Sequence, residues 1–193
     1  GMAADVVLDA LRAGKNVITA NKALMATRGA EIFHTADDHG VEVAFEASVG
    51  GGIPIIQPLK HSLISNEINT VLGIVNGTTN YMLTEMEQGL DYDTVLKRAQ
   101  ELGYAEADPT ADVDGYDAAA KIAILASIAF NSRVTLDDVF TQGIRSIEPV
   151  DFRHAEDMGY TIKLLAIAHK IDGEIDVRVH PVSYTHLRAH ETG

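Results

Sequence analysis

The order strand, helix, strand near the N-terminus constrains the fold of this chain more than any other feature. Residues 17–20 form a short β-branched run, and residues 23–39 follow as a helical segment that Gly40 ends. Residues 41–47 have the pattern of a second strand. Two short strands joined by a helix indicate a parallel α/β unit.

The rest of the chain predicts an α+β arrangement. Strands are expected at residues 70–75, 144–147, 161–171 and 174–179, and Asp172-Gly173 between the last two is a typical hairpin turn. We expect these strands to form a mixed sheet covered by helices. Helices are expected at residues 3–13, 59–65, 116–130, 136–141 and 151–158, from Asp91 or Asp93 to Leu102, and from a cap at Thr78 or Thr79 to Gln88.

Composition argues against several classes of function. The 193-residue chain has a formal net charge of -13, and binding to nucleic acid or to an anionic membrane requires a basic face instead. It has no cysteine, which excludes disulfides, thiolate nucleophiles and zinc–thiolate centres. The N-terminal segment is amphipathic and does not resemble a signal peptide, and no apolar run reaches transmembrane length. We therefore expect a cytoplasmic protein.

An acidic segment followed by an apolar helix, residues 106–121, carries the most chemistry. Asp117 and Lys121 are four residues apart, so they share one face of the expected helix. That helix is otherwise apolar, and a lysine on a largely buried helix is unusual. A partly buried lysine beside a carboxylate can keep its proton and donate it to an oxygen. The acidic residues of the segment are Glu106, Asp108, Asp112, Asp114 and Asp117.

Three interpretations of this segment compete. The first is a surface ion pair beside a solvated acidic loop, which is common. The second is a calcium loop, but its first ligand position would be Thr110 and its twelfth Lys121, where a bidentate glutamate is required. The third is an active site in which carboxylates hold an ammonium group and a lysine polarises a carbonyl. From the residues alone, the first and the third remain equally supported.

A longer pattern favours the third interpretation. The segment is similar to the catalytic region of homoserine dehydrogenases, which have the pattern G-Y-x-E-x-D-P-x-x-D-x-x-G-x-D-x-x-x-K. VITANKAL, FEASVGGGIPII and GIVNGTTNYML also resemble family motifs in the family's order, and the similarity covers residues 5–181. The matching positions are Gly103, Tyr104, Glu106, Asp108, Pro109, Asp112, Gly115, Asp117 and Lys121.

The resemblance implies an NAD- or NADP-dependent oxidoreductase that interconverts L-aspartate 4-semialdehyde and L-homoserine in threonine, methionine and isoleucine biosynthesis. Lys121 would donate a proton to the developing alkoxide, and Asp117 would orient Lys121 and the substrate. Glu106, helped by Asp112, would bind the substrate ammonium group. This assignment agrees with the chemistry, since an ammonium group prefers carboxylates and an oxygen gaining charge prefers a positioned cation.

Other residues receive roles only through the resemblance. Lys22 would lie near both substrate and nicotinamide, although alone it would be interpreted as a solvated loop lysine. Gly103 would approach the cofactor closely, and Asn76, Gly77 and Thr78 would line the substrate pocket. The glycine-rich loop of residues 48–59 by itself indicates only a tight turn. By resemblance it would bind a sodium ion through Glu46 and the carbonyl groups of Val49, Gly51 and Ile53.

The expected fold is therefore α/β, with a partial Rossmann-like cofactor domain and an α+β substrate domain. We expect residues 1–47 to be a remnant of the dinucleotide-binding domain and residues 48–182 to bind substrate and dimerise. We expect residues 183–193, with His186 and His190, to be a non-native tail. Because the sequence contains no G-x-G-x-x-G turn, the chain is expected to be inactive alone. The parent would be a homodimer or homotetramer, and the alternative is a non-catalytic ligand-binding or oligomerisation module.

Overall fold

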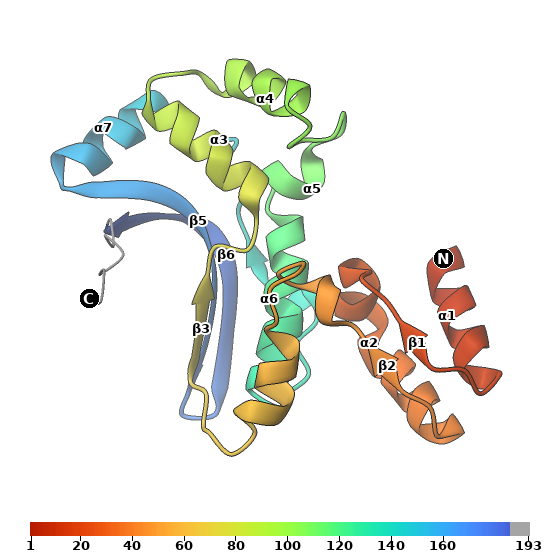
Figure 1. The fold of residues 1–193 in the computed structure, drawn as a ribbon. Helices are drawn as coiled ribbons and strands as arrows, with labels where there is room; N and C mark the ends of the chain where they lie inside the picture. The colour runs from red at the N-terminus through yellow and green to blue at the C-terminus, as the bar shows by residue number, and fades with distance from the viewer. Residues whose placement is uncertain (186–193) are drawn as a thin grey trace, which may run out of the picture. The chain divides into compact units, whose positions relative to one another are not determined.

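The computed structural model describes residues 1–185 (Figure 1). The chain divides into two compact units, and helix α6 and strands β5 and β6 each run from one unit into the other. Unit 1 comprises Gly1–Val71, Ala119–Phe140 and Ile167–Arg178, and unit 2 comprises Leu72–Ala118, Thr141–Ala166 and Val179–Gly193.

The N-terminal part of unit 1 is the expected parallel α/β element. Strands β1 and β2 pair in parallel, with Val17 opposite Val43 and Ile18 opposite Ala44. Helix α1 packs on α2 through a face of small and aliphatic residues at helical spacing. Gly40 ends α2 in the left-handed conformation, with φ of 63°. The elements are α1 (Met2–Arg12), β1 (Val17–Ile18), α2 (Lys22–His39) and β2 (Val43–Ala44).

Unit 2 contains a group of helices around α3 (Figure 1). Helix α3 packs against α4, α5 and α7. The expectation that Thr78 or Thr79 caps α3 is wrong, because the Asn76 side chain caps it by accepting a hydrogen bond from Thr79 N. Asp91 caps α4, as one of the two candidates expected. These helices are α3 (Gly77–Glu87), α4 (Tyr92–Glu101), α5 (Thr110–Val113) and α7 (Pro149–Asp157).

The second sheet has four strands in the order β3-β5-β6-β4. The hairpin between β5 and β6 is confirmed: Asp172 and Gly173 both have positive φ, as a two-residue primed turn requires. The strand expected at residues 144–147 is wrong, because that segment is a turn and the fourth strand is β4. The strands are β3 (Thr70–Gly73), β4 (Phe140–Thr141), β5 (Tyr160–Ile171) and β6 (Glu174–Thr185).

Strand β6 is longer than expected, since it continues through Pro181 to Thr185. The first residues of the expected tail, 183–185, are therefore part of a strand. The rest of that tail, including His186 and His190, lies outside the described residues.

Helix α6, Tyr116–Ala129, is buried on almost all sides, as expected from its apolar sequence. Every residue from Asp117 to Ala126 is buried except Lys121, which is half-buried. The helix therefore fixes the backbone of both residues that the sequence singled out. Within residues 1–185, no helix combines the length and apolar character needed to cross a membrane.

Candidate active site

Two carboxylates and one amide form the centre of the site in unit 2. The Nδ2 atom of Asn76 donates to Asp112 Oδ1 at 2.7 Å and to Asp117 Oδ2 at 2.8 Å. The Oδ1 atom of Asn76 accepts from Thr79 N at 2.9 Å and from Thr79 Oγ1 at 2.7 Å. Both N–H groups and both lone pairs of this amide are thus used, which fixes its orientation.

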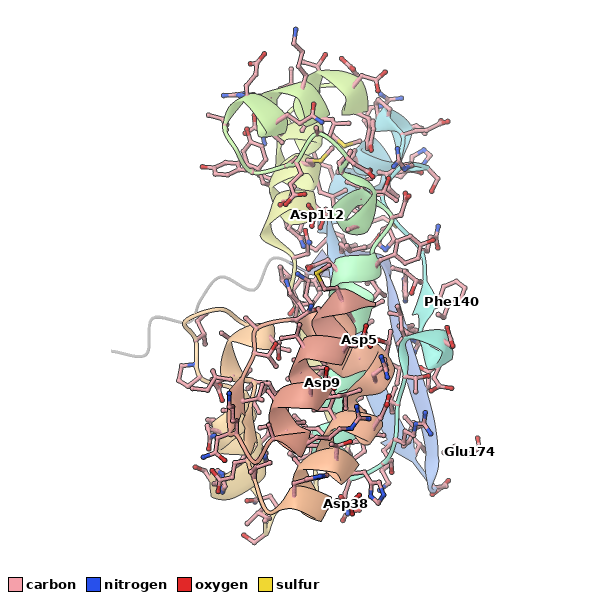
Figure 2. The ribbon with its side chains drawn as sticks, turned by 90° about the vertical axis from the view of Figure 1, so that its right-hand side faces the viewer. Asp5, Asp9, Asp38, Asp112, Phe140 and Glu174 are labelled. Carbon is pink, nitrogen blue, oxygen red and sulfur yellow. The ribbon has the colours of Figure 1, made fainter. Side chains whose placement is uncertain are left out.

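Each member of this group comes from a different element. Asn76 follows β3 and caps α3, Asp112 lies on α5 (Figure 2), and Asp117 is in the first turn of α6. Asn76 and Asp117 are buried, with 4% and 8% of their surface exposed, whereas Asp112 is half-buried. The positive end of the helix dipole favours a carboxylate at Asp117. The arrangement concentrates negative charge at the edge of the buried core and suits a cationic group.

The Asn76 amide contacts only one of the two carboxylate oxygens of Asp112. The Oδ1 atom of Asp112 accepts the hydrogen bond from Asn76. Among residues 1–185, no hydrogen bond reaches the Oδ2 atom of Asp112. Two carboxylates that share one amide nitrogen repel each other, and a bound ammonium group relieves this repulsion. Asp112 is thus the carboxylate of the pair that is both accessible and supported.

The segment before α5 holds the remaining acidic residues. Glu106 is exposed, and its carbonyl oxygen accepts from Gln100 Nε2 at 3.0 Å. Asp108 accepts from the backbone of Thr110 at 3.1 Å, and hydrogen bonds from the hydroxyl and N–H of Thr110 lower the pKa of Asp108. The Asp108 side chain therefore holds the start of α5, whereas the Glu106 side chain is exposed.

Residues at the start of α3 also hold the backbone just before the acidic segment, at Tyr104, in place. Thr78 Oγ1 donates to Tyr104 O at 2.6 Å, and the Tyr104 ring packs edge-on against Tyr81 at 5.1 Å. Gly103 has φ of 76°, which favours glycine, and a Cβ there would meet nothing within 4 Å. Gly77 is the first residue of α3 and is exposed.

Asn80 was not identified from the sequence, yet it supports the site. It is 8% exposed, and its side chain donates to Asn76 O and Leu164 O and accepts from Leu164 N at 3.0 Å. It therefore ties α3 to β5 directly behind Asn76. The only sequence signal was its position four residues after Asn76, which places both on one helical face.

Unit 1 holds the other predicted residues. Lys22 is the half-buried first residue of α2, directly after the Asn21 side chain, which caps the helix by accepting from Leu24 N at 3.0 Å. Lys121 follows Asp117 by one turn of α6. Lys22 thus stands at a helix N-terminus immediately beyond a parallel strand, where α/β proteins place ligands.

The glycine-rich loop is organised by Glu46. Its carboxylate accepts hydrogen bonds from the N–H groups of Ile55, Ile56 and Gln57 at 2.6, 2.9 and 2.8 Å. Partial burial raises the pKa of Glu46, but the N–H groups of Gln57, Ile55 and Ile56 lower it more, so its pKa lies below the ordinary glutamate value. The carboxylate therefore holds the start of the π-helical turn Pro58–Ser62.

This loop fits a monovalent cation through its backbone. Among residues 1–185, the carbonyl oxygens of Val49, Gly51 and Ile53 accept no backbone hydrogen bond, and Glu46 O accepts only from Val49 N at 3.4 Å. Such neutral oxygens suit a hard ion of low charge. Among the same residues, no group of three or more histidine, aspartate or glutamate side chains lies close enough to hold a metal.

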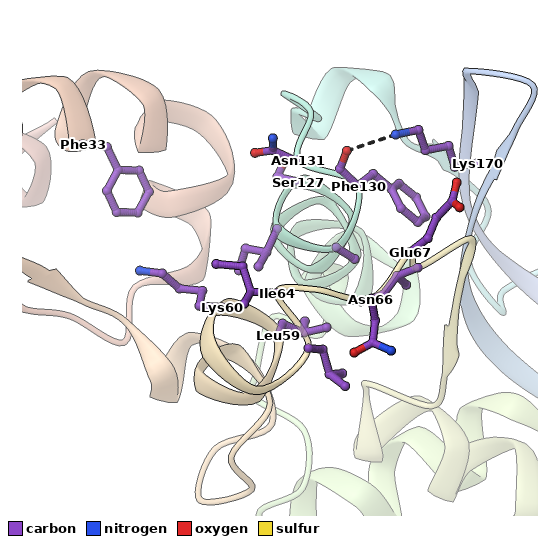
Figure 3. A pocket seen from close by; sticks show the side chains of 14 residues that line it. Phe33, Leu59, Lys60, Ile64, Asn66, Glu67, Ser127, Phe130, Asn131 and Lys170 are labelled. Carbon is purple, nitrogen blue, oxygen red and sulfur yellow. Dashed lines mark hydrogen bonds between the residues drawn. The ribbon is translucent and has the colours of Figure 1, made fainter.

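A separate cavity of about 630 Å³ lies within unit 1 (Figure 3). It is lined by residues of α2, the π-helical turn and the end of α6, and Lys170 Nζ donates to Phe130 O at 3.3 Å on one side. None of the residues expected at the site lines it. The cavity is therefore distinct from the carboxylate group.

Comparison with known proteins assigns the chain to a family. The model of homoserine dehydrogenase matches residues 54–192, and the model of the homoserine dehydrogenase NAD binding domain matches residues 2–46. The chain belongs to the homoserine dehydrogenase family. The curated homoserine dehydrogenase of Synechocystis is 55% identical over 184 residues, which are 93% of this chain and 42% of that protein. The chain thus spans less than half the length of such relatives.

Solved homoserine dehydrogenases have the same fold. The enzyme of Thiobacillus denitrificans superimposes with a TM-score of 0.93 and 48% identity, over 97% of this chain and 44% of that one. A hyperthermophilic archaeal homoserine dehydrogenase in complex with NADPH gives a TM-score of 0.84 at 29% identity, over 97% of this chain and 54% of that one. The expected α/β class, with a Rossmann-like part and a sheet packed by helices, is confirmed for this chain.

Proposed function

We propose that this chain is the substrate-binding and catalytic part of an enzyme that interconverts L-aspartate 4-semialdehyde and L-homoserine. The observation that carries the proposal is the pair Asp112 and Asp117, bridged by Asn76, at the start of the helix whose next turn holds Lys121. The carboxylates suit the amino-acid ammonium group, and the lysine suits an oxygen that gains negative charge. On this proposal the reaction belongs to threonine, methionine and isoleucine biosynthesis.

In this proposal, the charge of each side chain determines which group of the substrate it contacts. Glu106 and Asp112 bind the ammonium group, and Gly77 and Thr78 line the pocket beside Asn76. Asp117 orients the substrate and Lys121. When reduced NAD or NADP is bound, its nicotinamide supplies the hydride to the carbonyl carbon. Lys121 donates its proton to the carbonyl oxygen as the alkoxide develops, a contribution of about 10²- to 10⁴-fold for a positioned general acid.

The chain contributes part of a cofactor site. Lys22 is proposed to serve both nicotinamide and substrate, which its position at the first turn of α2 supports, and Gly103 is proposed to admit a close ligand, which the open space beside it supports. The family matches to residues 2–46 and 54–192 support a division between a cofactor-domain remnant, 1–47, and a substrate and dimerisation domain, 48–182. Because the sequence lacks a G-x-G-x-x-G turn, it does not supply the usual pyrophosphate contacts.

Four further assignments accompany this function. Glu46, Val49, Gly51 and Ile53 hold sodium, supported by the carbonyl groups described above. The enzyme is a homodimer or homotetramer, supported by the half-exposed Leu72 on the edge strand β3. It works in the cytoplasm, which agrees with a cysteine-free sequence and a nicotinamide cofactor. The non-native tail, residues 183–193, is proposed from its composition alone.

A chimeric enzyme tests the function. This chain replaces the matching 184 residues of the Synechocystis homoserine dehydrogenase, and homoserine-dependent reduction of NAD or NADP is followed by absorbance. We expect turnover in the chimeric enzyme and a loss of about 10³-fold in kcat for Lys121→Ala. Lys97→Ala, at an exposed position of α4, is the matched control. Wild-type turnover in Lys121→Ala would return Lys121 to the role of a surface ion-pair partner.

A further inference from the structure

The turn that joins α5 to α6 carries both carboxylates, and a second segment holds it in place. This turn, residues 112–117, has Asp112 and Asp117 at its ends. The second segment, Gly143–Arg145, contacts Val113 and Asp114 of this turn, and we call it the clamp. Ile144 and Arg145 belong to the run that the sequence predicted to be a strand, but the clamp forms no part of the sheet.

Two polar contacts join the clamp to the turn. Ile144 N donates to Val113 O at 2.8 Å. Arg145 donates to both carboxylate oxygens of Asp114, through Nε to Oδ1 and through Nη2 to Oδ2, the latter at 3.4 Å. A two-point guanidinium–carboxylate contact fixes orientation as well as distance.

Gly143 allows these contacts to form. A Cβ at this position would lie 2.1 Å from Val113 O and 2.5 Å from Asp114 Cα, both of which are backbone atoms. The turn would have to move away from the clamp to admit any side chain. On the turn itself, Gly115 has φ of 86°, and a Cβ there would lie 3.1 Å from Thr141 Cγ2. At Gly143 the clamp backbone therefore lies as close to the turn as a glycine permits.

Stability alone does not account for the Arg145–Asp114 pair. The two side chains are 48% and 29% exposed, and ion pairs at such positions contribute little to folding. The pair instead restrains residue 114, which stands between the two carboxylates that share the Asn76 amide. A small shift of this turn changes the separation of Asp112 and Asp117.

We propose that Gly143 and Arg145 are positioning residues, which set the spacing of Asp112 and Asp117 and so determine affinity for the substrate ammonium group. This inference rests on the proposed function and deepens it. Neither residue touches the substrate. Both act through Val113 and Asp114, whose backbone lies between the two carboxylates.

The test compares two ion pairs of similar exposure. Arg145→Ala removes the clamp contact, whereas Arg98→Ala removes the Arg98–Glu85 pair, which is 54% and 23% exposed and does not reach the turn. Both variants are made in the chimeric enzyme. We expect both to lower the melting temperature by a similar, small amount, and only Arg145→Ala to raise the KM for homoserine, by about tenfold or more. The KM for the nicotinamide cofactor should change less than about twofold in both.

Two more variants make the test specific. Arg145→Lys keeps the charge without the two-point geometry and should recover only part of the homoserine affinity. Gly143→Ala should raise the KM for homoserine at least as much as Arg145→Ala. If Gly143→Ala fails to fold, the comparison of Arg145→Ala, Arg145→Lys and Arg98→Ala decides alone. An unchanged homoserine KM in Arg145→Ala overturns the clamp, whereas a wild-type chimeric enzyme that does not oxidise homoserine overturns the proposed function itself.

Discussion

Asn76 and Asp117 lie 41 positions apart in the sequence and are joined by a hydrogen bond of 2.8 Å from Nδ2 to Oδ2. The same nitrogen reaches Asp112, and the oxygen of the same amide caps α3. One amide side chain, whose hydrogen-bonding groups are all used, therefore links the start of α3 to two carboxylates. We propose that these carboxylates bind and orient the substrate. Because of this link, we expect the site to tolerate a change of charge or geometry less at Asn76 than at its other residues.

Asn76→Asp should damage activity more than stability. The change keeps the oxygen that caps α3 and places a third carboxylate against Asp112 and Asp117. Two charge-assisted hydrogen bonds are lost, so kcat/KM for homoserine in the chimeric enzyme should fall about 100-fold, the equivalent of about 3 kcal/mol. Asn66→Asp, at an exposed position, is the matched control and should retain full activity. Equal activity in the two variants would contradict the bridging role.

Asn80→Leu should destabilise the fold of the isolated chain. The substitution has a similar volume but leaves the N–H and carbonyl groups of Leu164 without their partners in a buried setting. Unpaired buried polar groups cost about 1–3 kcal/mol each, so we expect a loss of about 3 kcal/mol in urea unfolding. Thr84→Val, one turn later on α3, should cost less than about 1 kcal/mol. A near-neutral Asn80→Leu variant would show that Leu164 finds other partners.

Glu46→Gln should change how stability depends on pH. The folded-state pKa of Glu46 lies below its ordinary value: burial opposes this, but the N–H groups of Gln57, Ile55 and Ile56 prevail. A lowered folded-state pKa means that the ionised form stabilises the fold. This contribution is complete above about pH 5 and is lost as the pH falls through the folded-state pKa.

We therefore expect Glu46→Gln to be less stable than wild type by about 1–2 kcal/mol at neutral pH, because a hydrogen bond to a charged acceptor is stronger than one to an amide. The difference should shrink as the pH falls through the folded-state pKa, where the wild-type carboxylate becomes protonated. Urea unfolding over a pH series measures it. Glu42→Gln, an exposed carboxylate near the same strand, is the control and should show no such trend. A constant difference at every pH would show that shape, rather than charge, matters at this position.

The isolated 193-residue chain should show little dehydrogenase activity. It holds the proposed proton donor and carboxylates, but its sequence contains no glycine-rich pyrophosphate turn. Oxidation of NADH and NADPH with aspartate semialdehyde measures this directly, and the chimeric enzyme is the positive control. Robust turnover by the chain alone would mean that residues 1–47 bind the cofactor without that turn.

Much of the fold followed from local patterns. The parallel pair β1 and β2, the hairpin at Asp172-Gly173 and the buried helix α6 all appear where periodicity and turn chemistry placed them. The strand expected at residues 144–147 is a turn in the structure, because two isoleucines, Ile144 and Ile147, do not by themselves distinguish a strand from a tightly packed turn. Ile144 N donates to Val113 O at the α5–α6 turn, and Ile147 N donates to Ile144 O within the segment itself, so neither bond joins the sheet.

The sequence by itself determined the family, through nine residues at fixed spacing, and it placed Asp117 and Lys121 on one helical face because helical spacing is a local property. Only the tertiary structure decided which partners those residues have. Asn76 bridges two carboxylates 36 and 41 positions away, and Arg145 reaches Asp114 from 31 positions away. Such pairings depend on how helices and turns pack across the core, and no spacing along the chain encodes them.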